Sequence, residues 1–141
     1  SRISNEIRET RGLAYSAYSY FSPMRAAGPY TLGLQTRGDQ AQQAVEILDQ
    51  TLNDFIKDGP TAVELTASKK NITGGFPLRI ASNSNIAGNL AMIGFYDLPL
   101  DYLDRFNERV EAVTADQIRA TYKRRVHPDR MVTVTVGTTT P

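Results

Sequence analysis

Two side chains near the start of the sequence could bind a peptide: Arg8 and Tyr15, which are seven positions apart. The arginine guanidinium is a planar fork of N–H donors that suits carbonyl and carboxylate oxygens, and tyrosine carries one O–H donor on a rigid ring. Together they could hold a peptide carbonyl. The same residue types also fit a structural role, as a helix-capping arginine and a half-buried core tyrosine. The residues by themselves leave both interpretations open.

The elements around this pair place it at a boundary between a helix and a strand. Two isoleucines four residues apart share a helix face and predict a helix over residues 2–10. Gly12 is in position to end that helix, because glycine accepts the left-handed conformation that follows many helices. Aromatic and small residues alternate from 13 to 21, which is typical of a strand. Arg8 and Tyr15 are therefore expected on two regular elements joined by one turn.

The remainder of the chain is predicted to be mostly helical. In chain order, the elements expected after the first strand are a strand at 30–37, helices at 39–58, 61–73, 79–95, 100–113 and 114–125, and a strand at 130–136. The first two strands are expected to form an antiparallel hairpin. Because strands and helices are segregated along the chain, the predicted fold class is α+β, an antiparallel sheet with helices packed on one face, in a single domain over residues 1–141.

Composition and charge argue against several classes of protein. Hydrophobic residues make up 40% and charged residues 22% of the 141 residues, as in an ordinary globular domain. The net charge is +1, and the basic run at residues 123–125 lies at a predicted helix C-terminus, where cations stabilise the helix dipole, so nucleic-acid binding is not expected. The chain has no cysteine for disulfides or thiolate metal sites. No apolar run is long enough to suggest a membrane span.

Enzyme chemistry is incomplete in this sequence. The one histidine, His127, lies in a predicted turn beside a proline, so a zinc site lacks ligands and a Ser-His-Asp arrangement lacks a placed base. The pair Gly74-Gly75 follows a helix and lacks the Lys-Ser/Thr of a phosphate-binding loop. A catalytic role would therefore need residues from a partner chain or domain.

The run Glu-Ile-Arg-Glu-Thr-Arg-Gly-Leu-Ala-Tyr-Ser, residues 6–16, resembles the C-terminal-half signature of the pitrilysin-type zinc peptidases. These are the inverzincins, which include insulysin and the mitochondrial processing peptidase. Further matches in the family's order are Gly28-Pro29-Tyr30, the helix starts at 61–65 and 113–118, and the valine-rich end before Gly137. Each piece is short, but their order and spacing extend over nearly the whole chain.

The resemblance implies a role for each member of the pair. In this family, a zinc site of the form His-x-x-Glu-His plus a distant Glu lies on a separate N-terminal domain. The C-terminal domain supplies an arginine and a tyrosine seven positions apart. By resemblance, Arg8 binds substrate peptide oxygens, and Tyr15 donates to the scissile carbonyl as it becomes an oxyanion. No metal or cofactor is then expected in this chain, and zinc would come from a partner domain or subunit of the same enzyme.

The sequence departs from the family in two respects. It contains no His-x-x-Glu-His, so the chain alone is expected to be inactive. The family domain begins with a strand and a helix ahead of this segment, so the domain is expected to be incomplete at its N-terminus, with a sheet edge that a second copy could cover in a homodimer. The alternative function is a catalytically inactive scaffold or interaction domain of the same fold. The compartment stays open, with a bacterial periplasm or cytoplasm favoured over the mitochondrial matrix.

Overall fold

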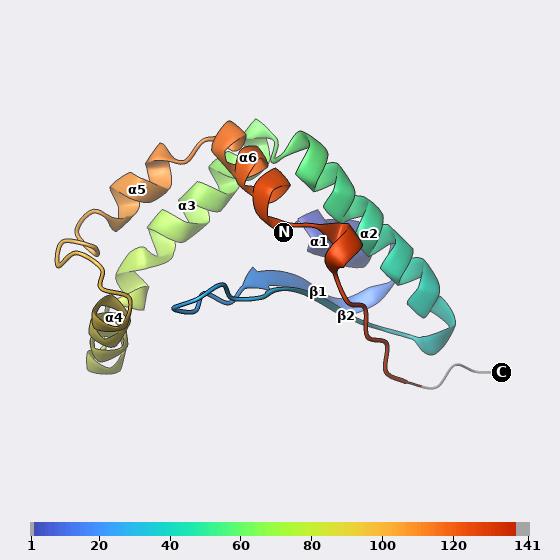
Figure 1. The fold of residues 1–141 in the computed structure, drawn as a ribbon, viewed down its shortest axis with the longest axis horizontal. Coiled ribbons are helices and arrows are strands. Elements are labelled where there is room, and N and C mark those ends of the chain that lie inside the picture. The colour runs from blue at the N-terminus through green and yellow to red at the C-terminus, as the bar shows by residue number, and fades with distance from the viewer. Residues whose placement is uncertain (1, 138–141) are drawn as a thin grey trace. The chain divides into compact units, whose positions relative to one another are not determined.

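The structure is a computed structural model, and it describes residues 2–137 (Figure 1). The chain forms two compact units. The first joins residues 1–59 to residues 119–141, and the second is the continuous segment 60–118. The assignment of all 141 residues to one domain stays a prediction, because the packing that the structure defines lies within each unit.

The first unit is a β-hairpin with helices on one of its faces (Figure 1). In chain order, its elements are α1 (Arg2–Ser4), the π-helix η1 (Asn5–Thr10), β1 (Ala14–Phe21), β2 (Tyr30–Thr36), the 3-10 turn η2 (Gly38–Gln40), α2 (Ala41–Asp58), the last part of α6 (Ala115–Arg125) and the 3-10 turn η3 (Pro128–Arg130). The predicted order of helix, turn and antiparallel hairpin is confirmed.

The core of the first unit lies where the N-terminal helix meets the hairpin and α2. Its buried members and the apolar residues packed on them are Ile3, Ile7, Leu13 and Ala14, with Ala17, Leu32, Leu34, Ile47 and Leu48 around them. Ile7 is fully buried, which alone stabilises the fold by roughly 1.5–3 kcal/mol. Because Ile7 is fixed in this way, the helix that carries it has a defined rotation relative to the hairpin.

An aromatic cluster packs at the other end of the first unit. The ring of Tyr122, on α6, packs edge-on against Phe55 of α2, with 4.8 Å between ring centroids. The rings of Phe21 and Tyr30 stack across the hairpin at 4.3 Å and both contact Tyr122 edge-on. Edge-on aromatic contacts of this kind add to the apolar burial. They join α2, α6 and the far end of the hairpin.

The second unit is helical. Its elements are α3 (Ala62–Arg79), α4 (Asn83–Phe95), α5 (Phe106–Ala112) and the first part of α6. Both predicted capping boxes are confirmed, since Thr61 exchanges hydrogen bonds with Glu64, and Thr114 with Gln117. Across residues 2–137, no helix is both long enough and apolar enough to cross a bilayer.

The predicted break of α3 at Gly74-Gly75 is wrong. The helix continues through both glycines and through Pro77, and ends at Arg79. Packing outweighs the low helix propensity of these residues. The ring of Phe76 stacks on that of Phe106 in α5, with 4.6 Å between ring centroids. This contact favours helical backbone next to the two glycines, which have low helix propensity.

Two further helices begin later than predicted. α4 begins at Asn83 rather than at residue 79, because the Ser82 hydroxyl accepts a hydrogen bond from the Asn85 N–H at 3.1 Å and caps the helix. α5 begins at Phe106, and residues 100–105 form turns. The polar residues before α4 therefore act as a cap and a turn.

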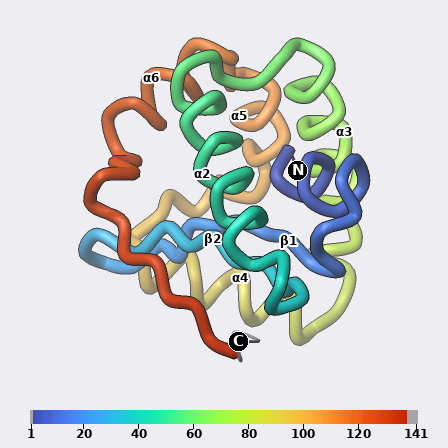
Figure 2. Tube along the Cα trace, turned by 90° about the vertical axis from the view of Figure 1, so that its right-hand side faces the viewer, coloured from blue at the N-terminus to red at the C-terminus, as the bar shows by residue number. Residues whose placement is uncertain are grey.

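The strand predicted at 130–136 does not form. Residues 131–137 have no strand partner among the described residues. The sheet that those described residues form has two strands, β1 and β2. Val132, Val134 and Val136 are strongly exposed. Met131 has extended backbone, and Figure 2 shows the trace continuing beyond η3 toward the C-terminus. Alternation of valine and threonine favours a strand only where a neighbouring strand supplies hydrogen bonds.

Candidate functional site

Arg8 lies on the π-helix η1, whose hydrogen bonds join residues five apart. Its neighbour Ile7 faces the core, and the Arg8 side chain is 53% exposed. The Nε of Arg8 is 3.4 Å from a carboxylate oxygen of Glu9, which is also exposed. π-helices are rare and often occur at functional sites. The helix type is therefore a second indication, beside the residue types, that this turn is a candidate site.

Gly12 ends the helix as predicted. Its φ is +61°, in the left-handed region that glycine adopts without a steric penalty. Two backbone hydrogen bonds close the turn: the Gly12 N–H donates to the Arg8 carbonyl at 3.1 Å, and the Leu13 N–H donates to the Ile7 carbonyl at 2.9 Å. The start of β1 is therefore tied directly to the helical turn that carries Arg8.

Tyr15 is the extra residue of a β-bulge. Ala14 pairs with Thr36 and Ser16 pairs with Gln35, so three residues of β1 lie opposite two of β2. The side chain of Tyr15 is 86% exposed, whereas Ala14 is buried. The tyrosine is therefore a surface residue, and the half-buried core position considered from the sequence is excluded.

The bulge decides which way Tyr15 points. In a regular strand, Tyr15 would lie on the same face as Ala17, which packs on the core. One extra residue shifts that alternation and directs the tyrosine to solvent. The hydroxyl of Thr36 donates to the Leu13 carbonyl at 2.5 Å and holds the two strands together just before the bulge.

The turn and the bulge bring Arg8 and Tyr15 together. The Cζ atom of Arg8 lies 5.8 Å from the centroid of the Tyr15 ring, within the range of a cation–π contact. Guanidinium N–H groups and a phenolic O–H thus lie on one exposed surface. This arrangement can bind an oxygen acceptor such as a peptide carbonyl or a carboxylate.

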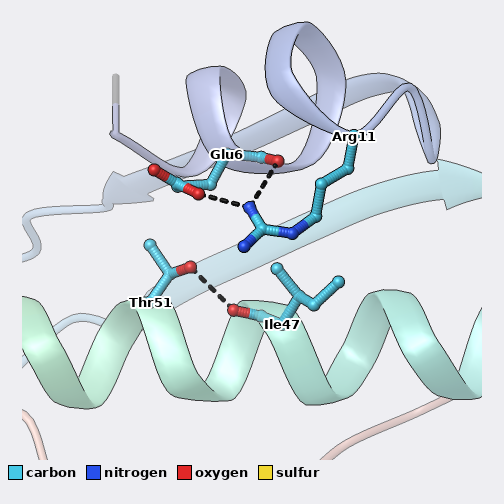
Figure 3. A network of polar contacts seen from close by, with 4 residues as sticks. All are labelled: Glu6, Arg11, Ile47 and Thr51. Carbon is cyan, nitrogen blue, oxygen red and sulfur yellow. Dashed lines mark hydrogen bonds and ion pairs between the residues drawn. The ribbon is translucent and has the colours of Figure 1, made fainter.

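A second arginine, at the end of the same helix, contacts a residue in its first turn. One nitrogen of Arg11, Nη1, contacts the Glu6 carboxylate and also donates to the Glu6 backbone carbonyl at 3.1 Å (Figure 3). Figure 3 shows the guanidinium reaching back along η1, beside the part of α2 that carries Ile47 and Thr51. Sequence reasoning singled out neither Glu6 nor Arg11. Opposite charges five residues apart were the available signal, but that spacing is meaningful only once the π-helix is known.

The described residues do not fit a zinc ion. Within residues 2–137, no group of three or more His, Cys, Asp or Glu side chains could hold a metal. Zinc needs at least three protein ligands in a catalytic site. A catalytic zinc ion would therefore need ligands from outside the described residues.

One tyrosine with a perturbed pKa lies outside the site. Burial, and secondarily a hydrogen bond with Tyr30, raises the pKa of Tyr122 above the ordinary value of about 10. Its ring is packed against the aromatic cluster described above. The perturbation has a structural cause, and Tyr122 is a packing residue.

The part of the chain that carries the pair matches a known family. The family profile of the peptidase M16 inactive domain matches residues 1–72, just over half of the chain. The chain belongs to the peptidase M16 inactive domain family. This confirms the resemblance to pitrilysin-type peptidases and the assignment to their C-terminal, inactive domain. Arg8 and Tyr15 both fall within the matched segment.

Curated relatives of this M16 domain are bacterial and longer than the chain. The uncharacterized zinc protease YmxG of Bacillus subtilis is 39% identical over 90 residues, which cover 63% of this chain and 22% of the relative. The non-peptidase homolog YmxG of Helicobacter pylori is 30% identical over 121 residues, which cover 84% of this chain and 27% of the relative. The chain thus spans about a quarter of the length of these relatives.

Solved structures have the same fold. A peptidase M16 inactive domain from Pseudomonas fluorescens superposes with a TM-score of 0.84 at 36% identity, covering 92% of this chain and 31% of that one. The periplasmic protease PqqL from Escherichia coli superposes with a TM-score of 0.70 at 17% identity, covering 86% of this chain and 14% of that one, and supports the fold alone. The predicted α+β fold class is confirmed.

Proposed function

We propose that this M16 domain is the substrate-binding half of a zinc metallopeptidase, and that Arg8 and Tyr15 bind the peptide. The observation that carries the proposal is the placement of two exposed donor side chains on a helix end and a strand bulge, with the Arg8 Cζ atom 5.8 Å from the centroid of the Tyr15 ring. Relatives named as zinc proteases support the reaction class.

Arg8 would orient the substrate. Its N–H groups suit a backbone carbonyl or a terminal carboxylate, which guanidinium binds through two parallel hydrogen bonds. The contact with the Tyr15 ring restricts the rotamers of the long side chain, so less entropy is lost when the peptide binds.

Tyr15 would act on the scissile carbonyl. A phenolic O–H placed where negative charge develops stabilises the transition state more than the ground state. Removal of one such donor typically costs about 10²–10³ in kcat. Rigid placement matters for this role, and the bulge and the ring contact with Arg8 both restrict the tyrosine.

The zinc would lie on another domain or subunit of the same enzyme. When bound there, it supplies a polarising charge and an activated water. This chain would contribute only binding and polarisation of the peptide. A His-x-x-Glu-His motif elsewhere in the same parent chain would place the two halves in cis, and its presence on a second chain would place them in trans.

The test is Tyr15→Phe in the assembled parent enzyme. This change keeps the ring, and thus the contact with Arg8, and removes only the hydroxyl. We expect kcat to fall by about 10² with little change in KM. Tyr20→Phe is the matched control, because it removes a hydroxyl from another exposed tyrosine of β1. An unchanged kcat in the Tyr15 variant, or an equal fall in the control, would exclude the assigned role.

A catalytically inactive scaffold of the same fold is the alternative function. The relative from Helicobacter pylori is named a non-peptidase homolog, so the name of one relative favours this alternative. The Tyr15→Phe experiment distinguishes the two functions. A scaffold would retain its assembly and show no peptidase activity that depends on Tyr15.

We also propose that the chain pairs with a second copy when its sheet has no other partner. Segment 131–137 and the outer edges of the hairpin have no strand partner within residues 2–137, and they offer backbone groups that a second copy could satisfy. The exposed valines would supply apolar area for such a homodimer.

A further inference from the structure

Glu6 lies in the π-helix η1 and Arg11 caps its C-terminus, and the two are in contact across the helix end; we infer that they are positioning residues for Arg8. This inference rests on the proposed function of Arg8 and Tyr15. Neither Glu6 nor Arg11 presents a group to the proposed substrate; both act through the conformation of the helix on which Arg8 lies.

The spacing of the two charges selects the helix type. In an α-helix each residue turns by about 100°, so side chains five residues apart point roughly 140° away from each other. In a π-helix the backbone hydrogen bonds join residues five apart, so a residue and the one five positions later lie on the same face, and Arg11 caps η1 five residues after Glu6. Glu6 and Arg11 are five apart and in contact through the carboxylate and the backbone carbonyl. Their pairing therefore favours the π-helix over the α-helix.

The helix type determines how the chain enters β1. An α-helix that ends in a Schellman motif is closed by a hydrogen bond that spans five residues. Here the closing bond from the Leu13 N–H to the Ile7 carbonyl spans six, because the preceding turn is wide. A change to α-helix would break this bond, shift Gly12 and turn Arg8 away from Tyr15.

The contact between Glu6 and Arg11 is exposed, so its effect is local. The two side chains are 38% and 42% exposed, and ion pairs at such positions contribute little to global stability. The unit is held together by its buried residues, of which Ile7 is the most completely enclosed. Variants of the pair are therefore expected to fold and to differ in the conformation of η1.

The activity test uses Arg11→Met in the full-length parent enzyme. We expect kcat/KM to fall about tenfold, because a displacement of about 1 Å at a positioned group has effects of this size or larger. The same change made in an Arg8→Ala background should cause less than about a twofold further loss, since its effect passes through Arg8. Arg105→Met is the matched control: it breaks another exposed arginine–glutamate pair, with Glu108, in the second unit and should leave kcat/KM unchanged.

A second measurement is independent of activity. Amide hydrogen exchange of residues 5–13 in the full-length protein should become faster in Arg11→Met and slow again in the charge-exchanged Glu6→Arg/Arg11→Glu variant. Unchanged exchange in Arg11→Met would overturn the inference whatever the activity. Fully additive losses with Arg8→Ala would also overturn it. If Arg8→Ala alone left kcat/KM unchanged, the proposed function would fail, and the exchange result would still decide whether Glu6 and Arg11 maintain the π-helix.

Discussion

The guanidinium of Arg8 lies over the ring of Tyr15, 5.8 Å from its centroid, although a helix end, a left-handed glycine and an extra strand residue separate the two along the chain. Each of these three features adds a constraint on the pair. The wide turn rotates Arg8, Gly12 reverses the chain, and the bulge turns the tyrosine outward. The pair can therefore be disturbed at positions that never touch a substrate.

Gly12→Ala should destabilise the protein. The glycine has a φ of +61°, and a Cβ there meets no atom within 4 Å, so the penalty is conformational rather than a clash. We expect the free energy of unfolding to fall by about 1 kcal/mol, measured by urea denaturation. Gly74→Ala is the control, since that glycine lies within α3 with equally open space. It should raise stability by up to about 1 kcal/mol. Similar effects at both positions would argue against a backbone requirement at Gly12.

Arg8→Lys should weaken substrate binding although it conserves the charge. Lysine is a point charge and lacks the planar fork that binds one carboxylate or carbonyl through parallel hydrogen bonds. We expect KM to rise about tenfold with a smaller change in kcat, measured with a peptide substrate on the assembled enzyme. Arg109→Lys is a matched control, because Arg109 also lies over a tyrosine ring, that of Tyr102, at 5.2 Å in the second unit. A lysine variant at position 8 with normal KM would show that charge alone suffices.

Stability should decline at alkaline pH because of Tyr122. Burial favours the neutral phenol, so the pKa of Tyr122 is raised in the folded state. The unfolded chain then ionises first, near pH 10, and the contribution of this residue is present below that pH and is lost as pH rises toward the folded pKa. Unfolding measured from about pH 9 to 11 should show a smaller decline in Tyr122→Phe. The exposed control Tyr20→Phe should keep the decline. An equal slope in Tyr122→Phe and the parent would contradict the assignment.

The chain of 141 residues should self-associate when it is studied alone, and Val134→Lys should reduce this. Val134 is at the centre of the exposed valine alternation, and a lysine there adds charge to an edge that would otherwise pair. Light scattering at several concentrations measures the outcome. Lys57→Met, on α2, is a control that removes a lysine and should not alter the association. A monodisperse monomer for the unaltered chain would exclude the homodimer.

Local signals were sufficient for the helix end at Gly12 and for the capping boxes at Thr61 and Thr114, because each depends on residues within one turn. The break at Gly74 was predicted by the same local reasoning and was wrong, since the ring of Phe76 gains a partner from α5. Intrinsic propensity decides helix boundaries only where packing does not.

Features that depend on register could not be predicted from the sequence. The alternation around Tyr15 gives no sign of the extra residue, which appears only when β1 is aligned with β2. The ion pair of Glu6 and Arg11 is informative only in a π-helix, and no propensity scale distinguishes that helix from an α-helix. The valine segment around Val134 has the pattern of a strand and lacks a neighbour among the described residues. Strand formation is a property of two segments, and one sequence window describes only one of them.

The π-helix makes the number of residues before Gly12 as important as their identity. Loss of one residue within Asn5–Thr10 would allow α1 to continue as an α-helix and would rotate the preceding turn by about 100° relative to the strand. Ile7 would then turn from the core toward the surface, and Arg8 would turn from the surface toward the core. Within this family, a one-residue deletion in that segment should therefore be far less tolerated than a change of side chain, and a variant library of deletions and substitutions would measure the difference.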